Sequence, residues 1–159
     1  MNARSKFALI LASAALATSQ GVSAATPNAK LWNGTWHLDA AKSKFASSGK
    51  EQSETRTYDI SGGKVTMKSS SKDPSGKGLN FSYSAALDGK SYPMVGNPNA
   101  DSITLTAVSP TQFSAKSRLK GKLTVQSTAT VSADGKHLTL SRKMLAMKGA
   151  PTDVLMFDR

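Results

Sequence analysis

The sequence has 159 residues, no cysteine, and 21 lysine or arginine residues against 10 acidic ones, so its formal net charge is +11 at pH 7. This length suits one domain with a single hydrophobic core. The lack of cysteine excludes disulfides, thiol catalysis and zinc sites with cysteine ligands. The positive charge favours anionic partners.

The N-terminal segment has the pattern of a secretory signal peptide. Two basic side chains precede an apolar run at residues 7–18, and small residues follow at 22–24. The run is shorter than the roughly 20 residues that a membrane span needs, and no cysteine follows that could carry a lipid anchor. We expect residues 1–24 to be removed. Residues 25–159 would then form one periplasmic or secreted domain without a transmembrane segment.

The first expected strand begins with the sequence GTWHLDAAKSKF at residues 34–45. Within it, residues 40–45 are expected to form one helical turn with Asp39 as the N-cap. No helix of useful length is expected elsewhere, because apolar side chains recur there with a period of two.

Further strands are predicted by this alternation, and the turns between them are short. The expected strands are residues 55–60, 64–70, 79–87, 103–107, 113–119, 123–131, 137–145 and 153–157. Residues 92–99 contain two prolines, which are unfavourable in a central strand. This segment is expected either to cover a barrel opening, with Tyr92 and Met94 facing inward, or to be a connection with no role beyond topology.

About nine strands with short connections predict an all-β, antiparallel up-and-down meander. Closure would remove the two bare edges of such a sheet. We therefore expect a lipocalin-like β-barrel of about eight to ten strands, wide enough for packed side chains or one small ligand. The outer positions are mostly serine, threonine, lysine and asparagine, which argues against an outer-membrane barrel.

Two motifs resemble those of a family of secreted bacterial proteins of unassigned function, usually described as lipocalin-like. They are GTW…KSKF at residues 34–45 and DGKxYPxxGNPxxD at residues 88–101. The resemblance covers most of the chain after the expected signal peptide. It implies a calycin-type barrel and carries no known reaction.

The resemblance also implies structural roles for Gly34 and Trp36. In such barrels the glycine lets the N-terminal segment cross the closed end, and the indole fills that end beneath an arginine from late in the chain. Arg142 and Arg159 are the candidates for that arginine.

Side chains that could carry chemistry are few. His37 and His137 are far apart in the sequence and are expected at exposed positions, and the acidic residues lie mostly in turns. We see no spacing typical of a metal site or of a Ser-His-Asp arrangement. No enzymatic activity, metal or cofactor is therefore expected.

Two arginines lie on the apolar side of their expected strands, where a buried guanidinium needs an anion or a hydrogen-bonding partner. Arg56 and Tyr58 share one strand face, which resembles the carboxylate grip inside fatty-acid-binding barrels. These two residues, with Arg142, are hypothesised to hold the anionic end of an apolar ligand. Alternatively, each arginine lies at the rim, reaches water or packs on Trp36.

The predicted ligand-binding residues are Arg56, Tyr58, Met67, Phe81, Tyr83 and Arg142; Leu105 and Val125 are further inward candidates. Small residues at inward positions leave room for a cavity but also suit a tapering barrel end. They are Ala85, Ala107, Ala115, Ser127 and Ala129.

Two functions remain open. In the first, a hollow barrel binds a small apolar or amphipathic molecule. In the second, a barrel filled with side chains binds an anionic envelope component through a basic stripe formed by Lys116, Arg118, Lys120 and Lys122. Nucleic acid is not an expected partner.

Overall fold

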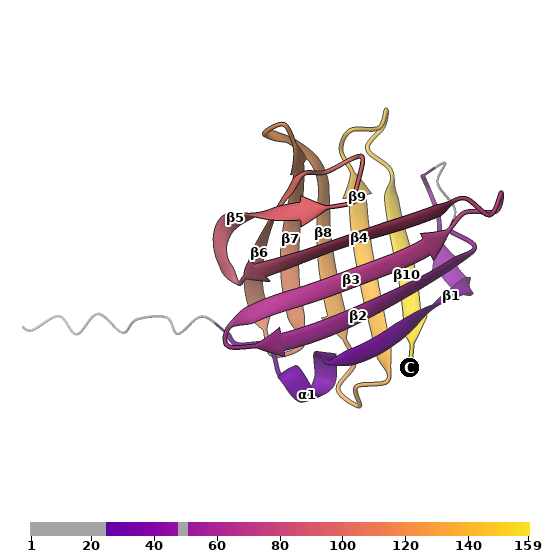
Figure 1. Ribbon diagram of the computed structural model, residues 1–159. Coiled ribbons are helices and arrows are strands. Elements are labelled where there is room, and N and C mark those ends of the chain that lie inside the picture. The colour runs from indigo at the N-terminus through magenta and orange to yellow at the C-terminus, as the bar shows by residue number, and fades with distance from the viewer. Residues whose placement is uncertain (1–24, 48–50) are drawn as a thin grey trace, which may run out of the picture.

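The computed structural model describes residues 25–47 and 51–159, so the expected signal peptide lies outside the described residues. Ten antiparallel strands close into a single barrel in which each strand pairs with its sequence neighbours and β1 pairs with β10 (Figure 1). The strands are β1 (Gly34–Lys44), β2 (Ser53–Ser61), β3 (Lys64–Lys72), β4 (Gly78–Ala86), β5 (Asp88–Val95), β6 (Ser102–Ser109), β7 (Gln112–Leu119), β8 (Lys122–Val131), β9 (His137–Met144) and β10 (Thr152–Asp158). The predicted all-β, up-and-down barrel is confirmed.

Alternation within each strand determines which side chains enter the barrel. In β2, Arg56 and Tyr58 are buried while the residues between and beside them are more exposed. The register places Tyr58 opposite Met67 on β3, and Met67 opposite Tyr83 on β4. Inward side chains therefore form rows that run across neighbouring strands.

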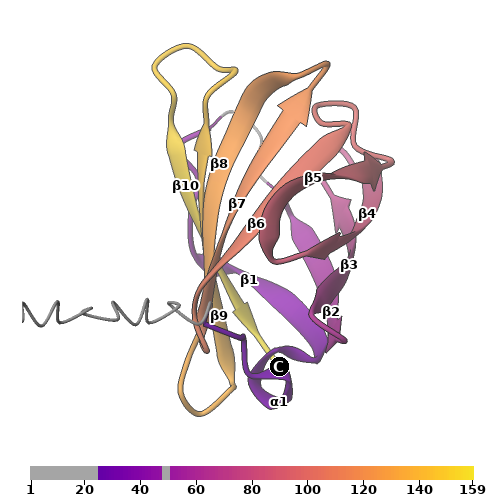
Figure 2. The same cartoon turned by 90° about the vertical axis from the view of Figure 1, so that its left-hand side faces the viewer.

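One end of the barrel is closed by a single helical turn, α1 (Ala29–Trp32), which the sequence pattern did not predict (Figure 2). The Asn28 side chain caps it by accepting a hydrogen bond from the backbone N–H of Lys30. Trp32 is fully buried and packs against the rings of Tyr58 and Phe113, with centroid distances of 5.7 and 4.6 Å. The helix thus places an aromatic plug across this end.

Trp36 and Arg159 complete the closure. The Trp36 indole Nε1 donates to the Trp32 carbonyl at 3.0 Å, and the Arg159 guanidinium lies 4.5 Å from the indole centroid. Gly34 has a φ of +129°, and a β-carbon there would come within 3.3 Å of the Arg159 Nη1 atom. Arg159, not Arg142, is therefore the late arginine that stacks on the tryptophan.

The helical turn predicted at residues 40–45 is wrong, because β1 continues to Lys44. The Asp39 carboxylate accepts hydrogen bonds from the N–H groups of Ala41 and Lys42 at 3.1 and 3.0 Å, as an N-cap would. However, the chain pairs with β10 on both sides of this point, with a shift of register between Asp39 and Lys44. The local carboxylate contacts support an irregularity in a strand and not a helix.

Residues 92–95 belong to strand β5, although Pro93 argued against a central strand. The N–H of Met94 donates to the Asp101 carbonyl on the β6 side, so the position of Pro93 faces β4. The only paired residues across the β4–β5 seam are Ser82 with Val95 and Tyr83 with Met94, so the missing N–H costs no ladder hydrogen bond. Proline is tolerated because this seam is weakly paired.

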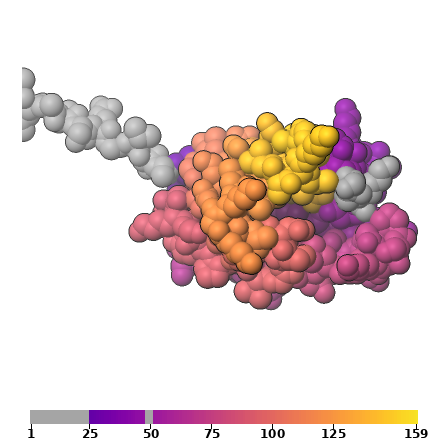
Figure 3. All heavy atoms as spheres, turned by 90° about the horizontal axis from the view of Figure 1, so that it is seen from above, coloured from indigo at the N-terminus to yellow at the C-terminus, as the bar shows by residue number. Residues whose placement is uncertain are grey.

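The opposite end of the barrel carries the β1–β2, β3–β4, β5–β6, β7–β8 and β9–β10 connections. Figure 3 looks onto this end, with the later connections in orange and yellow. The two ends of the barrel therefore differ: α1 and the tryptophans close one, and loops surround the other.

Within the described residues, no helix is long and apolar enough to cross a membrane.

Candidate ligand-binding cavity

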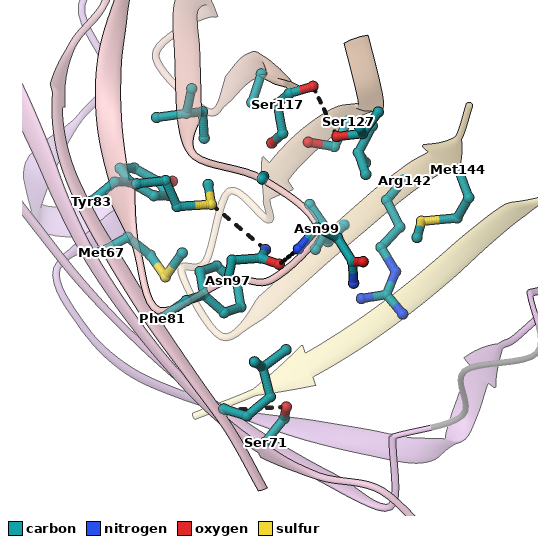
Figure 4. Close-up of a pocket in the computed structure, with 18 of the residues that line it drawn as sticks. Met67, Ser71, Phe81, Tyr83, Asn97, Asn99, Ser117, Ser127, Arg142 and Met144 are labelled. Atoms are coloured by element: carbon teal, nitrogen blue, oxygen red, sulfur yellow. Dashed lines mark hydrogen bonds between the residues drawn. The ribbon is translucent and has the colours of Figure 1, made fainter. Parts of the chain in front are cut away.

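A cavity of about 530 Å³ lies inside the barrel, on the side away from α1 (Figure 4). Its wall includes inward side chains from β2, β3, β4, β7, β8 and β9, and its mouth includes residues of the β1–β2, β5–β6 and β9–β10 connections. This volume falls in the range of small-molecule sites. The barrel is therefore hollow toward the loop end.

All six predicted ligand-binding residues line this one cavity: Arg56, Tyr58, Met67, Phe81, Tyr83 and Arg142. Val125 lines it as well, whereas Leu105 is buried in the core and does not. Among the small inward residues, Ala115, Ser127 and Ala129 line the cavity, and Ala85 and Ala107 do not. The small side chains of β7 and β8 leave the space that larger residues would fill.

Tyr92 and Met94, expected to face inward, have different surroundings. Met94 is buried and lines the cavity, whereas Tyr92 is partly exposed and its hydroxyl donates to the Asp88 carboxylate at 2.9 Å. The loop after β5 contributes Asn97 and Asn99, which point toward the cavity in Figure 4. Residues 92–99 thus form the end of strand β5 and part of the cavity mouth.

The mouth residues were not predicted, because loops have no periodic pattern that assigns a side chain to the inside. They are Ser47, Glu51, Asn97, Asn99, Ala100, Ala146 and Met147. The Gly-Asn-Pro-Asn sequence at residues 96–99 was a sequence signal for this part of the mouth, because it marks a tight turn. The turn lies between Met94 and Ala100, which both line the cavity.

Four methionines line the cavity: Met67, Met94, Met144 and Met147. Methionine side chains are unbranched and polarizable, so they adapt to irregular ligand shapes. Together with Phe81 they make much of the wall apolar and deformable.

Arg56 is buried in this wall but is not a free charge. It is 7% exposed, and its Nε donates to Glu54 Oε1 at 2.6 Å. Ser69 donates to the same oxygen at 2.7 Å. Burial lowers the pKa of Arg56, but the Glu54 carboxylate and the Tyr58 hydroxyl outweigh burial, so the pKa is raised and the guanidinium stays charged. Glu54 and Arg56 lie two residues apart on one strand, a spacing that the sequence already contained.

Arg142 lies in a second charged cluster near the mouth. Its Nη2 donates to both carboxylate oxygens of Glu51 at 2.8 and 2.9 Å, and its Nε donates to Asp153 Oδ2 at 3.1 Å. Asp153 also accepts from the backbone N–H groups of Ala46 and Ser47 and from the Ser47 hydroxyl. Burial raises the pKa of Asp153, but the hydrogen bonds from Ser47 and the charge of Arg142 lower it by more. The pKa of Asp153 is therefore below its usual value.

Tyr83 supplies a neutral hydroxyl next to the first cluster. Burial raises the pKa of Tyr83 well above its usual value, while Arg56 lowers it to a smaller extent. The phenol therefore stays protonated at neutral pH and can donate a hydrogen bond into the cavity.

The two histidines lie outside this site, as expected. His37 and His137 are exposed, and His137 Nδ1 is 2.6 Å from Asp158 Oδ1. Among the described residues, no group of three or more histidine, cysteine, aspartate or glutamate side chains is placed to hold a metal ion.

The fold and the cavity define a class: a closed antiparallel barrel that is plugged at one end and hollow toward the other. No protein-family model matches the sequence, and no curated protein matches it either.

Proposed function

We propose that this protein is an exported, lipocalin-like carrier that binds a small apolar or amphipathic molecule inside its barrel. The observation that carries the proposal is the cavity of about 530 Å³, with its methionine-rich wall and its loop-lined mouth. Export rests on the N-terminal sequence pattern alone.

Binding without catalysis is supported by the state of the charged groups. Each carboxylate that lines the cavity is paired with an arginine: Glu54 with Arg56, and Glu51 with Arg142. A general acid or base needs a proton that it can exchange with a substrate. Carboxylates held by guanidinium groups are poorly suited to that role.

Native mass spectrometry of the protein, purified without refolding from its own cells, tests the proposal directly. We expect a co-purifying small molecule, or uptake of the neutral fluorescent probe Nile red by the ligand-free protein. A bare polypeptide that takes up no Nile red would contradict the proposal.

Substitutions at two neighbouring residues of β8 test whether Nile red binds inside the cavity. Ser127 lines the cavity and Thr128, the next residue, does not. Ser127→Phe should fill the cavity and weaken Nile red binding, whereas Thr128→Phe adds the same ring outside and should leave binding unchanged. Equal effects of the two variants would indicate a surface site.

The alternative, a filled barrel that binds an anionic envelope component, is less well supported because the cavity is open. Without Arg4 and Lys6 of the expected signal peptide the chain has 19 basic and 10 acidic residues, and a net charge of 19 − 10 = +9 still makes such contacts physically reasonable. Salt separates the two functions: polyanion binding should weaken steeply with ionic strength, and binding in the cavity should hardly change.

A further inference from the structure

The Glu54 carboxylate contains the one buried side-chain oxygen or nitrogen atom that lacks a hydrogen-bond partner among the described residues. Its side chain is 2% exposed. Oε1 accepts from Arg56 and Ser69, but Oε2 accepts from none of the described groups. Buried carboxylate oxygens are normally satisfied, because desolvation without a donor is costly. Oε2 is itself almost fully buried, but the Glu54 side chain lines the cavity, so a small rotation of that side chain would bring Oε2 within reach of a donor on a bound molecule.

The charges around Oε2 decide which donor fits. Glu54 and Arg56 together carry no net charge, and Arg56 is held by its partner. An anionic head group would meet the unpartnered carboxylate oxygen and be repelled. A cationic head group would pair with Glu54 but would lie next to the buried Arg56 guanidinium. A neutral hydroxyl can donate to Oε2 without either cost.

The position of Glu54 along β2 sets the orientation of such a molecule. β2 starts at Ser53, on the loop side of the barrel, and runs toward the closed end. Glu54 is therefore near the mouth, and Tyr58 with its row of Met67 and Tyr83 lies deeper. A ligand whose hydroxyl is at Glu54 can extend its apolar part along Phe81 and Met67.

We infer that the cavity selects neutral amphipathic molecules whose hydroxyl group donates a hydrogen bond to Glu54 Oε2, with the apolar part pointing toward the closed end. This inference rests on the proposed binding function and names its ligand class. It differs from the anionic ligand that the Arg56–Tyr58 pattern indicated, because Glu54 pairs with the Nε of Arg56 and offsets its charge.

The experiment compares three probes with the same alkyl chain and different head groups: myristyl alcohol, myristic acid and myristylamine. Each competes with Nile red for the ligand-free wild-type protein at neutral pH. The alcohol should displace Nile red at a concentration about tenfold lower than the acid or the amine, which corresponds to one hydrogen bond to a charged acceptor.

Substitution of Glu54 gives the sharper prediction. Glu54→Gln removes the carboxylate and leaves Arg56 unpaired, so the preference should invert and the acid should become the strongest competitor. Glu54→Gln/Arg56→Met removes both charges, so the alcohol should lose its advantage and the acid should gain nothing. The control is Asp59→Asn, which removes a carboxylate from the exposed face of the same strand, outside the cavity. It should preserve the wild-type order. Thermal unfolding of each variant establishes that it is folded before binding is measured.

Two failures are distinguishable. If Nile red binds and all three probes displace it equally, the barrel binds apolar chains, but the Glu54 head-group site is wrong. The same conclusion follows if the acid is the best competitor of the wild type, or if folded Glu54→Gln retains the wild-type order. If neither Nile red nor any probe binds, the proposed carrier function itself fails.

Discussion

At the scale of single residues, the closed end shows how a local motif depends on a distant side chain. Gly34 and Trp36 open β1, but their partner is Arg159 at the other end of the chain. The Arg159 guanidinium also donates to the carbonyls of Asn33 and Gly135, at 2.7 and 2.5 Å. One arginine thus joins the N-terminal helix, β1 and the β8–β9 turn.

Arg159→Ala should lower the free energy of unfolding by about 1–3 kcal/mol, because the cation–π contact and several charged hydrogen bonds are lost together. Urea unfolding followed by tryptophan fluorescence measures this change. Arg118→Ala is the control, since the Arg118 side chain makes one hydrogen bond to the described residues, to the Thr104 hydroxyl. Equal losses in the two variants would show that Arg159 does not join these elements.

Gly96 provides a second residue-scale prediction. Its φ is +88°, and a β-carbon there would collide with the Asn80 carbonyl oxygen. Gly62 also has a positive φ, +55°, but no atom lies within 4 Å of its β-carbon position. Gly62→Ala should cost about 1 kcal/mol of stability from the backbone conformation alone, and Gly96→Ala clearly more. Similar losses in thermal unfolding would mean that the β5–β6 loop moves away freely.

At the scale of elements, the start of β10 holds the connection between β1 and β2 in place. The Asp153 carboxylate is fully buried and accepts from Ala46, Ser47 and Arg142. Because Ser47 and Glu51 both line the cavity mouth, this carboxylate positions one side of the site.

Asp153→Asn should cost about 3 kcal/mol in urea unfolding, since it breaks a buried ion pair and replaces an acceptor by a donor facing backbone N–H groups. Asp59→Asn, on an exposed position of β2, is the matched control and should stay within about 0.5 kcal/mol of the wild type. A small effect at Asp153 would indicate that Glu51 and Arg142 suffice to hold the connection.

At the scale of the whole molecule, the described aspartates make stability sensitive to acid. Hydrogen bonds, mainly from turn residues and lysines, lower the pKa values of six aspartates: Asp39, Asp73, Asp88, Asp101, Asp134 and Asp158. The pKa of Asp153 is lowered as well. The unfolded chain therefore takes up protons more readily than the folded chain.

This difference in proton uptake determines the direction in which stability changes with pH. The stabilisation is fully present above the unfolded aspartate pKa of about 3.9 and is lost as pH falls through the lower folded values. Urea midpoints measured at a series of pH values should be constant near neutrality and fall below about pH 5. The fall should be shallower in Asp153→Asn. Stability that rises on acidification would contradict the assignment of these carboxylates.

The barrel was predictable because alternation is a property of each strand by itself. Tyr58, Met67, Phe81 and Tyr83 could be placed inside from their neighbours alone, and they do line one cavity. The helical turn at residues 40–45 was wrong because the capping contacts of Asp39 are local, whereas pairing of β1 with β10 joins residues more than a hundred positions apart. Helix α1 was missed because a single turn carries too few residues for a period to be recognised.

The sequence by itself determined the fold class and the inward face of most strands, since these depend on local alternation and on side-chain type. Only the tertiary structure decided that the barrel is hollow, that Arg159 is the stacking arginine, and that Glu54 and Glu51 neutralise Arg56 and Arg142. The physical reason is the same in each case. Cavity volume and charge pairing depend on which side chains face one another after closure, and that register is set by contacts between distant parts of the chain.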